Sequence, residues 1–235
     1  MKLKVIHNPL KHWTEELSKE LRGFLVLDGH RIVRKGADAT ICIGGDGTVL
    51  YANYKKQLEG KILGIGSERS FICQLRKETW RKNIRKKLKE KTVDIPVIEA
   101  KIKNRKITAI NDVVVHTTDY RVIGMDVRID NKKQEFRGDG IIVSSAVGSS
   151  SYAFSAGGKK LNPKDNRIVV VPIAPYRRKF RAKVLKNETV SIKCDRKSAL
   201  IVDGIFIRNM EKGETIRIKK DGVLKFYKGV CFYGR

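Results

Sequence analysis

A glycine-rich turn that carries one acid constrains this chain more than any other feature. Gly44-Gly45-Asp46-Gly47-Thr48 directly follows the apolar run of residues 40–43 and precedes residues 49–54, which predict a helix. Glycines let the backbone approach an anionic ligand, and amides at a helix N-terminus favour phosphate. A carboxylate among such donors indicates proton abstraction or metal binding, so we interpret the turn as a phosphoryl-transfer centre. The pentapeptide alone leaves a plain strand-to-helix turn, with Asp46 as a cap, as the alternative.

The charge of the chain predicts anionic partners. Lys and Arg total 51 against 25 Asp and Glu, which gives a formal net charge of +26 over 235 residues. Nucleic acid, nucleotides, polyphosphate and acidic membranes all meet that requirement, and charge alone does not choose among them. The basic stretch of residues 78–91 has Trp80, Ile84 and Leu88 at helical spacing. Its charges are not interleaved with aromatic residues, which argues for a solvated helix face rather than a nucleic-acid surface.

The cysteines and the N-terminus indicate a cytoplasmic protein. Cys42, Cys73, Cys194 and Cys231 are far apart and form no CxxC pair, and the four histidines show no metal-ligand spacing. This usage favours a reducing compartment without a disulfide framework, and we expect no protein-held metal site. No apolar stretch is long enough for a signal peptide or a membrane span. We therefore expect a cytoplasmic chain with no membrane partner.

Residues 1–92 predict an α/β domain with a parallel, Rossmann-like sheet. Strand and helix patterns alternate, as such a layer requires. The predicted strands are residues 3–7, 24–27, 40–43 and 61–66. The predicted helices are residues 13–21, which we expect to stop at Gly23, then 49–54 and 78–91. Ligands of parallel sheets bind beyond the carboxyl ends of the strands, where the Asp46 turn falls.

Residues 93–214 predict a β-rich second domain. Short apolar runs alternate with turn signals such as Gly138-Asp139-Gly140 and Asp221-Gly222. The predicted strands are residues 93–102, 107–115, 122–129, 141–144, 167–171, 190–194, 199–202, 215–218 and 223–227.

Two segments of this second domain carry candidate binding groups. Residues 136–158 contain Gly138-Asp139-Gly140, then a strand, then the small hydroxyl-rich run Ser149-Ser150-Ser151-Tyr152. Hydroxyls and free amides can hydrogen-bond ribose or phosphate, and small side chains leave room for a large ligand; a serine-rich surface loop is the alternative. Asn111-Asp112 opens a strongly apolar strand, and an Asn side chain offers both a donor and an acceptor for an adenine edge. Taken alone, that pair also fits a simple turn.

Together these segments resemble the NAD kinase family, in a compact, archaeal-type form. The matching residues are Gly44-Gly45-Asp46-Gly47-Thr48, Asn111-Asp112 where the family usually has Asn-Glu, the block of residues 138–158, residues 171–176 and Val202-Asp203-Gly204. Diacylglycerol and sphingosine kinases and phosphofructokinases carry similar pentapeptides, whereas the serine-rich block is more specific to NAD kinases. The second glycine-rich loop departs from the family pattern, because residues 64–73 lack two expected glycines and gain Glu68 and Arg69.

The resemblance implies phosphoryl transfer from ATP or inorganic polyphosphate to the 2′-hydroxyl of the adenosine ribose of NAD, with Mg²⁺ or another divalent cation. Asp46 would orient or accept the hydroxyl proton, or bind the metal. The implied two-domain architecture returns residues 215–235 to the first domain, and a homodimer or homotetramer would complete the site. The residues implied to bind nucleotides are Gly44, Gly45, Gly47, Thr48, Phe71, Asn111, Asp112, Arg137, Asp139, Ser150, Ser151, Tyr152, Ser155 and Ala174, with Asp139 and Ala174 reaching the nicotinamide half.

Three alternatives stay open at this point. A lipid kinase of the diacylglycerol or sphingosine type shares the pentapeptide, although the serine-rich block fits a dinucleotide pocket better than a lipid pocket. A basic nucleic-acid-binding module on a kinase-like fold would use the net charge, although we do not expect nucleic acid as a partner. An inactive member of the kinase fold would account for the altered loop of residues 64–73.

Overall fold

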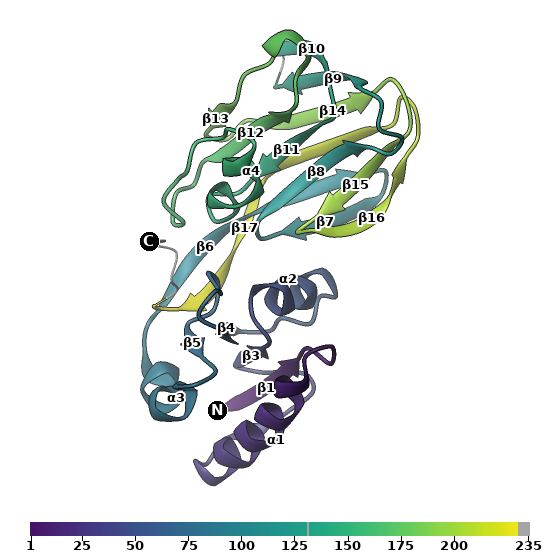
Figure 1. Ribbon diagram of the computed structural model, residues 1–235. Coiled ribbons are helices and arrows are strands. Elements are labelled where there is room, and N and C mark those ends of the chain that lie inside the picture. Colours follow the sequence, from purple (N-terminus) through teal and green to yellow (C-terminus); the bar gives the residue numbers. More distant parts are fainter. Residues whose placement is uncertain (131, 230–235) are drawn as a thin grey trace. The chain divides into compact units, whose positions relative to one another are not determined.

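Alternating strands and helices in the first 95 residues build a parallel sheet. The computed structural model describes residues 1–130 and 132–229, so Cys231 and the last part of the predicted returning segment lie outside the described residues. The chain divides into unit 1, which contains Met1–Ile95 together with residues from Leu224 onward, and unit 2, Pro96–Val223. Each unit has its own core, and the chain passes between the units twice (Figure 1).

The sheet of unit 1 is parallel along its described strands. Its strand order is β2-β1-β3-β4, with β5 and the end of β17 also pairing with β4. The strands are β1 (Lys2–His7), β2 (Arg31–Ile32), β3 (Ala39–Ile43), β4 (Lys61–Gly66) and β5 (Leu75–Arg76). The helices are α1 (His12–Leu27), α2 (Asp46–Tyr54) and α3 (Trp80–Lys89). This is the α/β layer that the sequence predicts.

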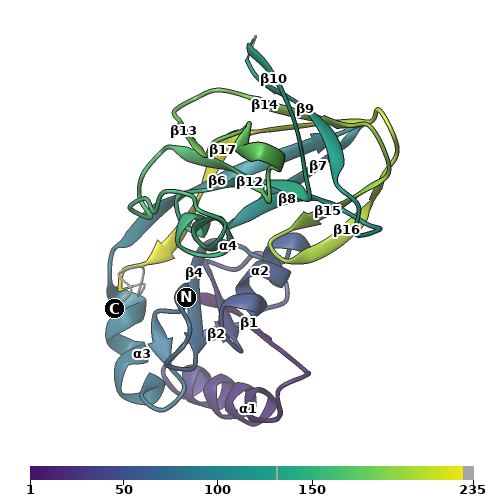
Figure 2. The ribbon, with the colours of Figure 1, turned by 45° about the horizontal axis from the view of Figure 1, so that its top comes forward.

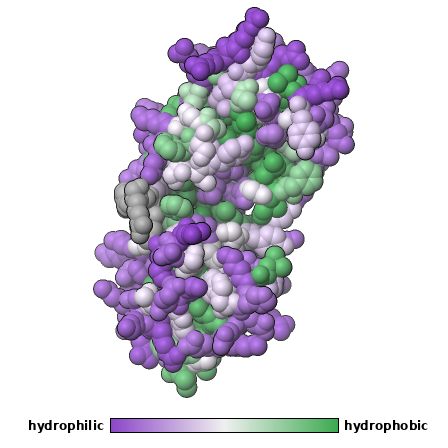
Figure 3. Space-filling view, viewed as in Figure 1, coloured by the Kyte–Doolittle hydropathy of each residue, from purple (hydrophilic) through white to green (hydrophobic). Residues whose placement is uncertain are grey.

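A single apolar cluster fixes α1 and α3 on this sheet. Leu17, Leu21 and Leu25 recur every fourth residue along α1 and are buried, as are Trp80, Ile84 and Leu88 along α3. These side chains join Leu3, Ile41 and Tyr227 in one core, so the last strand of the chain helps to close the first unit. The other face of α3 is basic, and Arg81 and Arg85 pair there with Glu20 and Asp28 of unit 1. Figure 3 shows hydrophilic residues over much of the surface formed by these helices.

The predicted helix stop at Gly23 and the predicted strand at residues 24–27 are wrong. Helix α1 continues through Gly23 to Leu27. Gly23 is exposed and has no heavy atom within 4 Å of a β-carbon built on it, so it weakens the helix without interrupting its packing. The four-residue repeat that ends at Leu25 keeps the helix on the core. The helix ends where the Gly29 N–H donates to the Val26 carbonyl oxygen with φ near +78°.

Unit 2 is built from antiparallel strands. One sheet has six strands in the order β13-β12-β11-β8-β15-β16. Its strands are β8 (Asp112–Thr117), β11 (Gly140–Ser144), β12 (Ile168–Ile173), β13 (Lys183–Leu185), β15 (Ser198–Val202) and β16 (Ile205–Met210). The other strands of unit 2 pair in the order β10-β9-β14-β17. Strand β6 lies between β17 and β7 and pairs with both. These strands are β6 (Thr92–Ile102), β7 (Arg105–Ala109), β9 (Ile123–Ile129), β10 (Lys132–Gly138), β14 (Val190–Cys194) and β17 (Thr215–Tyr227).

The hydroxyl-rich segment packs on the six-stranded sheet. It forms two short helices, η1 (Gly148–Ser150) and α4 (Tyr152–Ser155), and a third, η2 (Tyr176–Arg178), follows β12. Ala146, Ala153 and Leu161 bury against Val114, Ile142 and Val171 of the sheet. Figure 2 shows α4 beside β12 and β8. The apolar side chains therefore hold the segment down and leave Ser150, Ser151, Tyr152 and Ser155 at the surface.

Two strand boundaries differ from the sequence prediction. Residues 107–115 form two strands, because the chain turns at Ile110-Asn111 between β7 and β8. Residues 215–227 form one strand, because β17 continues through Asp221-Gly222, with Gly222 at φ near +84°. Strand β17 pairs with β14 near Ile216 and with β4 at Phe226. None of the described helices is both long and apolar enough to cross a membrane.

Candidate active site

The glycine turn lies at the carboxyl end of β3 and requires its glycines. Gly44 and Gly45 have φ of +142° and +100°, and helix α2 begins at Asp46. A β-carbon on Gly44 would lie 2.8 Å from the β-carbon of Asn8 and closer still to the Thr48 hydroxyl. The Gly44 N–H donates to the Ile65 carbonyl oxygen at 3.0 Å, which ties the turn to β4. The turn is thus packed on its inner side and occupies the ligand-binding edge of a parallel sheet.

The Asp46 carboxylate joins this turn to the loop that follows β4. Its Oδ2 accepts the Phe71 N–H at 2.7 Å and its Oδ1 accepts the Ile72 N–H at 2.9 Å. The residue that caps α2 is Gly45, which makes no side-chain cap, so Asp46 does not cap its own helix. Each carboxylate oxygen has two acceptor positions, and the two amides use one on each. Asp46 is therefore held rigidly and can still accept a proton or a hydrogen bond.

The second loop is stabilised by a guanidinium instead of the missing glycines. Arg76 donates from its Nη1 to the carbonyl oxygen of Ser70 at 3.1 Å and to that of Ser67. The backbone of this loop delivers the two amides to Asp46, while the Phe71 side chain is 55% exposed. The loop thus has a defined structure in this chain, and Phe71 is free to stack on a flat ligand.

In unit 2, Asp203 holds the Asn111-Asp112 pair in place. Its carboxylate accepts the N–H groups of Ile110, Asn111 and Asp112 at 2.9, 2.7 and 3.2 Å. Asp203 and Gly204 have φ of +51° and +75° and form the two-residue connection between β15 and β16, a favoured Asp-Gly hairpin turn. The sequence analysis noticed this Asp-Gly turn only as a family match. Its anchoring role depends on a contact across more than 90 residues, for which no local signal exists.

The hydroxyl-rich segment braces the same pair from its other side. The Asn111 carbonyl oxygen accepts the Ser145 N–H at 2.8 Å and the Ser144 hydroxyl at 3.0 Å. Ser149 is buried, donates to the Ala146 carbonyl oxygen at 2.6 Å and accepts the Leu161 N–H at 2.8 Å. Ser144, Ser145 and Ser149 are therefore structural. The hydroxyls left at the surface are those of Ser150, Ser151, Tyr152 and Ser155, all of which the sequence predicts as binding residues.

Two titratable groups of the candidate acceptor site have raised pKa values. Asp112 is 6% exposed, and burial, with a further contribution from the Asp203 charge, raises its pKa to about 7. The pKa of Tyr152 is raised by burial and then by the Asp112 and Asp139 carboxylates, so the structure brings Asp112, Asp139 and Tyr152 together. Asp139 also lies beside Ala174, because its N–H donates to the Ile173 carbonyl oxygen at 3.0 Å. Ala174 is exposed with φ of +44°, a conformation that side chains seldom adopt.

Arg137 lines a cavity of unit 2. The cavity has a volume of about 590 Å³ and is lined by residues of β9, β10, β14 and the segment after β12, including Phe136, Arg137, Tyr176 and Asp195. Among the described residues no group of three or more His, Cys, Asp or Glu side chains could hold a metal ion. The three described cysteines, Cys42, Cys73 and Cys194, are free, and burial raises the thiol pKa of each.

We expect Asp112→Asn to stabilise the protein, and to do so more at pH 8 than at pH 5. The Asp112 pKa is about 7 in the folded state and near 3.8 in the unfolded state, so ionisation costs stability as pH rises from about 4 to 7. The amide cannot ionise, and the gain at pH 8 should exceed that at pH 5 by on the order of 2 kcal/mol. Thermal unfolding of wild type and Asp112→Asn at both pH values measures this difference in stability. The exposed Asp221→Asn serves as the matched control, and equal shifts of Asp112→Asn at both pH values would contradict the expectation.

Comparisons with known proteins agree on one family. The family model for the ATP-NAD kinase C-terminal domain matches residues 110–227. An NAD kinase of Caldicellulosiruptor saccharolyticus is 32% identical over 231 residues, which cover 88% of this chain and 87% of the relative. The chain belongs to the NAD kinase family. An NAD kinase of Thermoplasma acidophilum is also 32% identical, over 89% of this chain and 80% of its own length.

Solved structures show the NAD kinase fold as well. An NAD kinase from Archaeoglobus fulgidus, in complex with ATP, superposes with a TM-score of 0.84 at 22% identity, covering 99% of this chain and 96% of that one. A yeast NADH kinase complexed with NADH gives 0.85 at 19% identity, covering 97% of this chain and 83% of that one. The predicted fold class, an α/β domain followed by a β-rich domain in the NAD kinase arrangement, is confirmed. The predicted family and its phosphotransferase class are confirmed too.

Proposed function

We propose that this chain transfers the terminal phosphoryl group of ATP, or of inorganic polyphosphate, to the 2′-hydroxyl of the adenosine ribose of NAD. The 2′-oxygen forms a bond to the terminal phosphorus while the bond from that phosphorus to the bridging oxygen breaks. The products are NADP and a donor shortened by one phosphate, and the hydroxyl proton leaves through Asp46. The observation that carries the proposal is the Asp46 carboxylate, which two amides fix in a glycine turn and which keeps acceptor positions free.

Unit 1 supplies the donor side in this proposal. The turn of Gly44, Gly45, Gly47 and Thr48 binds phosphate in this proposal, through the amides of Gly45 and Gly47 at the α2 N-terminus and the Thr48 hydroxyl. The exposed Phe71 ring offers a face to adenine. Mg²⁺, or another divalent cation, neutralises phosphate charge when bound. We propose that this cation enters on the donor phosphates, with Asp46 as the carboxylate of the turn that could contact it.

Unit 2 supplies the acceptor side. Asn111 presents an amide to the adenine edge, and its backbone is fixed by Asp203 and Ser145. Asp112 lies at its side, and the surface hydroxyls of Ser150, Ser151, Tyr152 and Ser155 bind adenine or ribose. Asp139, Ala174 and Arg137 bind the nicotinamide half, in a homodimer or homotetramer in which NAD of a neighbouring subunit is reached. A cytoplasmic location completes the proposal, because the chain's substrates are cytoplasmic nucleotides.

The test is formation of NADP from NAD, Mg²⁺ and either ATP or polyphosphate. The NADP formed is detected with a coupled NADP-specific dehydrogenase. NADH is offered as acceptor in parallel. We expect turnover with at least one donor, and size-exclusion chromatography with light scattering to show a mass above that of the 26.7 kDa chain. An absence of turnover with every donor and both acceptors would contradict the proposed reaction. Diacylglycerol and sphingosine serve as control acceptors, and their phosphorylation would favour the lipid-kinase alternative.

A further inference from the structure

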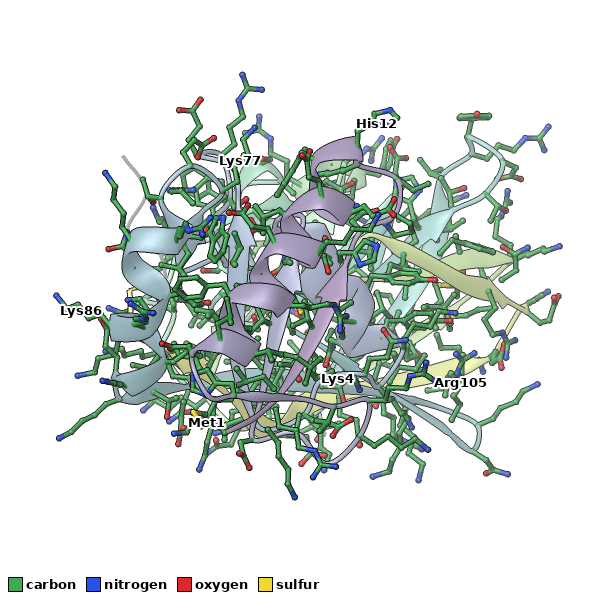
Figure 4. All side chains as sticks on the ribbon, turned by 90° about the horizontal axis from the view of Figure 1, so that it is seen from below. Met1, Lys4, His12, Lys77, Lys86 and Arg105 are labelled. Atoms are coloured by element: carbon green, nitrogen blue, oxygen red, sulfur yellow. The ribbon has the colours of Figure 1, made fainter. Side chains whose placement is uncertain are left out.

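The amino group of the residue that precedes α1 lies against the glycine turn of unit 1. Lys11 directly precedes α1, whose first residue, His12, is labelled in Figure 4. The Lys11 Nζ donates to the Gly44 carbonyl oxygen at 2.6 Å. A β-carbon built on Gly45 would lie 3.8 Å from this nitrogen and 3.0 Å from the Ser70 hydroxyl. The open side of Gly45 therefore faces one cation and one hydroxyl.

Two other kinds of donor lie near this position. Helix α2 begins here without a side-chain cap, so its first amides have no side-chain acceptor. The Thr48 hydroxyl is only 6% exposed, lies next to the Gly44 α-carbon and has no hydrogen-bond partner among the described residues. A β-carbon on Gly47 would meet no heavy atom within 4 Å, so the first turn of α2 is open on that side. Helix-start amides and an ammonium therefore lie at one end of α2, as an anion site would need, and an unpartnered hydroxyl lies at the base of the same turn.

We propose that Lys11 binds the phosphate chain of the phosphoryl donor and neutralises its charge. An ammonium has three N–H donors, and Gly44 uses one of them, which leaves two for phosphate oxygens. The Gly44 carbonyl oxygen holds the amino group at the turn in advance. Lys11 thereby supplies a positive charge to a donor site whose second loop lacks glycines that the family usually has. This inference rests on the proposed function, because it names a residue of the same donor site.

Lys11→Met keeps the length of the side chain and removes its charge. We expect the variant to bind ATP and inorganic tripolyphosphate about 10- to 100-fold more weakly by isothermal titration calorimetry, the loss of one charge-assisted hydrogen bond to phosphate. Adenosine, which has no phosphate, should bind with unchanged affinity, and the KM for NAD should change less than twofold. Lys11→Arg should recover most of the ATP affinity, because it keeps a positive donor at the turn.

A purely structural role for Lys11 predicts different results. If the amino group only braces the Gly44 carbonyl, Lys11→Met would lower the unfolding temperature and weaken ATP, adenosine and NAD alike. Lys19→Met is the matched control, since Lys19 lies on the same helix and pairs at the surface with Glu15. Equal losses for all ligands, or unchanged binding of ATP and tripolyphosphate, would overturn the proposal.

The binding assay also separates this inference from the proposed reaction. Wild-type protein could bind ATP more tightly than Lys11→Met and yet form no NADP. That result supports the phosphate-binding role of Lys11 and contradicts the proposed reaction. If the wild-type protein forms NADP and Lys11→Met binds both phosphate donors with wild-type affinity, the reaction is supported and the phosphate-binding role of Lys11 is contradicted. A wild-type chain that binds neither ATP nor tripolyphosphate contradicts both.

Discussion

Asp46→Asn is expected to lower kcat for NADP formation about 1,000-fold, within the range usual for loss of a general base. The amide cannot accept the 2′-hydroxyl proton as a carboxylate does. Its NH₂ group would also face an amide N–H, from Phe71 or from Ile72, that the carboxylate now satisfies. Steady-state kinetics with saturating NAD and donor measure the chemical step, and calorimetry measures the dissociation constants of both substrates.

The two roles of Asp46 are separated by where the loss appears. A loss confined to kcat, with both dissociation constants within about threefold of wild type, indicates proton transfer or orientation of the hydroxyl. Weaker donor binding with little change in kcat would instead indicate that Asp46 only arranges the loop. Asp38→Asn is the matched control, because Asp38 precedes the strand that Asp46 follows and its Oδ2 accepts the Lys2 N–H at 2.7 Å. Full activity of Asp46→Asn would remove this residue from the mechanism.

Gly148→Ala is expected to destabilise the protein by about 3 kcal/mol, the upper part of the range for overpacking. Its β-carbon would lie 2.7 Å from the Asn111 α-carbon, 2.5 Å from the carbonyl carbon and closer still to the oxygen. These are backbone atoms, so the methyl group is accommodated only if the turn between β7 and β8 moves. Asn111 moves with that turn, and the KM for NAD should rise at least 10-fold in addition to the drop in unfolding temperature.

Gly23→Ala is expected to raise the stability of the protein, whereas Gly148→Ala lowers it. Gly23 lies in α1 with open space around it, and alanine should stabilise the helix by about 0.5–1 kcal/mol without any change in kinetics. Thermal unfolding of both variants, with KM measured for each, completes the comparison. An unfolding temperature of Gly148→Ala equal to that of wild type would mean that the serine-rich segment is not packed tightly against Asn111.

The sequence predicted those parts of the fold that depend on periodicity. Trp80, Ile84 and Leu88 predict one helix face, and they are buried together on the parallel sheet of unit 1. The helix stop at Gly23 was wrong because burial of Leu25 outweighs the low helix propensity of one exposed glycine. The predicted turn at Asp221-Gly222 was wrong because β17 has pairing partners on both sides of it, β14 and β4.

The same limit applies to the candidate site: motifs that are continuous in sequence were predicted, and contacts between distant segments were not. The turn around Asp46 and the serine-rich block are continuous in sequence, so their motifs could be recognised directly. Lys11 and the anchoring role of Asp203 could not be found, because Lys11 contacts a residue 33 positions away and Asp203 contacts residues more than 90 positions away. The serines illustrate a second difficulty, since consecutive Ser149 and Ser150 have the same chemistry but opposite exposure. Only packing against the sheet decides which hydroxyl reaches the surface.

The path of β17 has a consequence for how the chain is made. Phe226 pairs with Ile62, and Tyr227 is fully buried among side chains from the first 95 residues. During synthesis the first 95 residues therefore emerge from the ribosome early, but unit 1 lacks a strand and a core side chain until residues 224–227 have been made. Unit 2, whose residues are contiguous, can complete its sheets before that moment. The order of maturation is thus the reverse of the order of translation, whereas N-terminal domains ordinarily fold first.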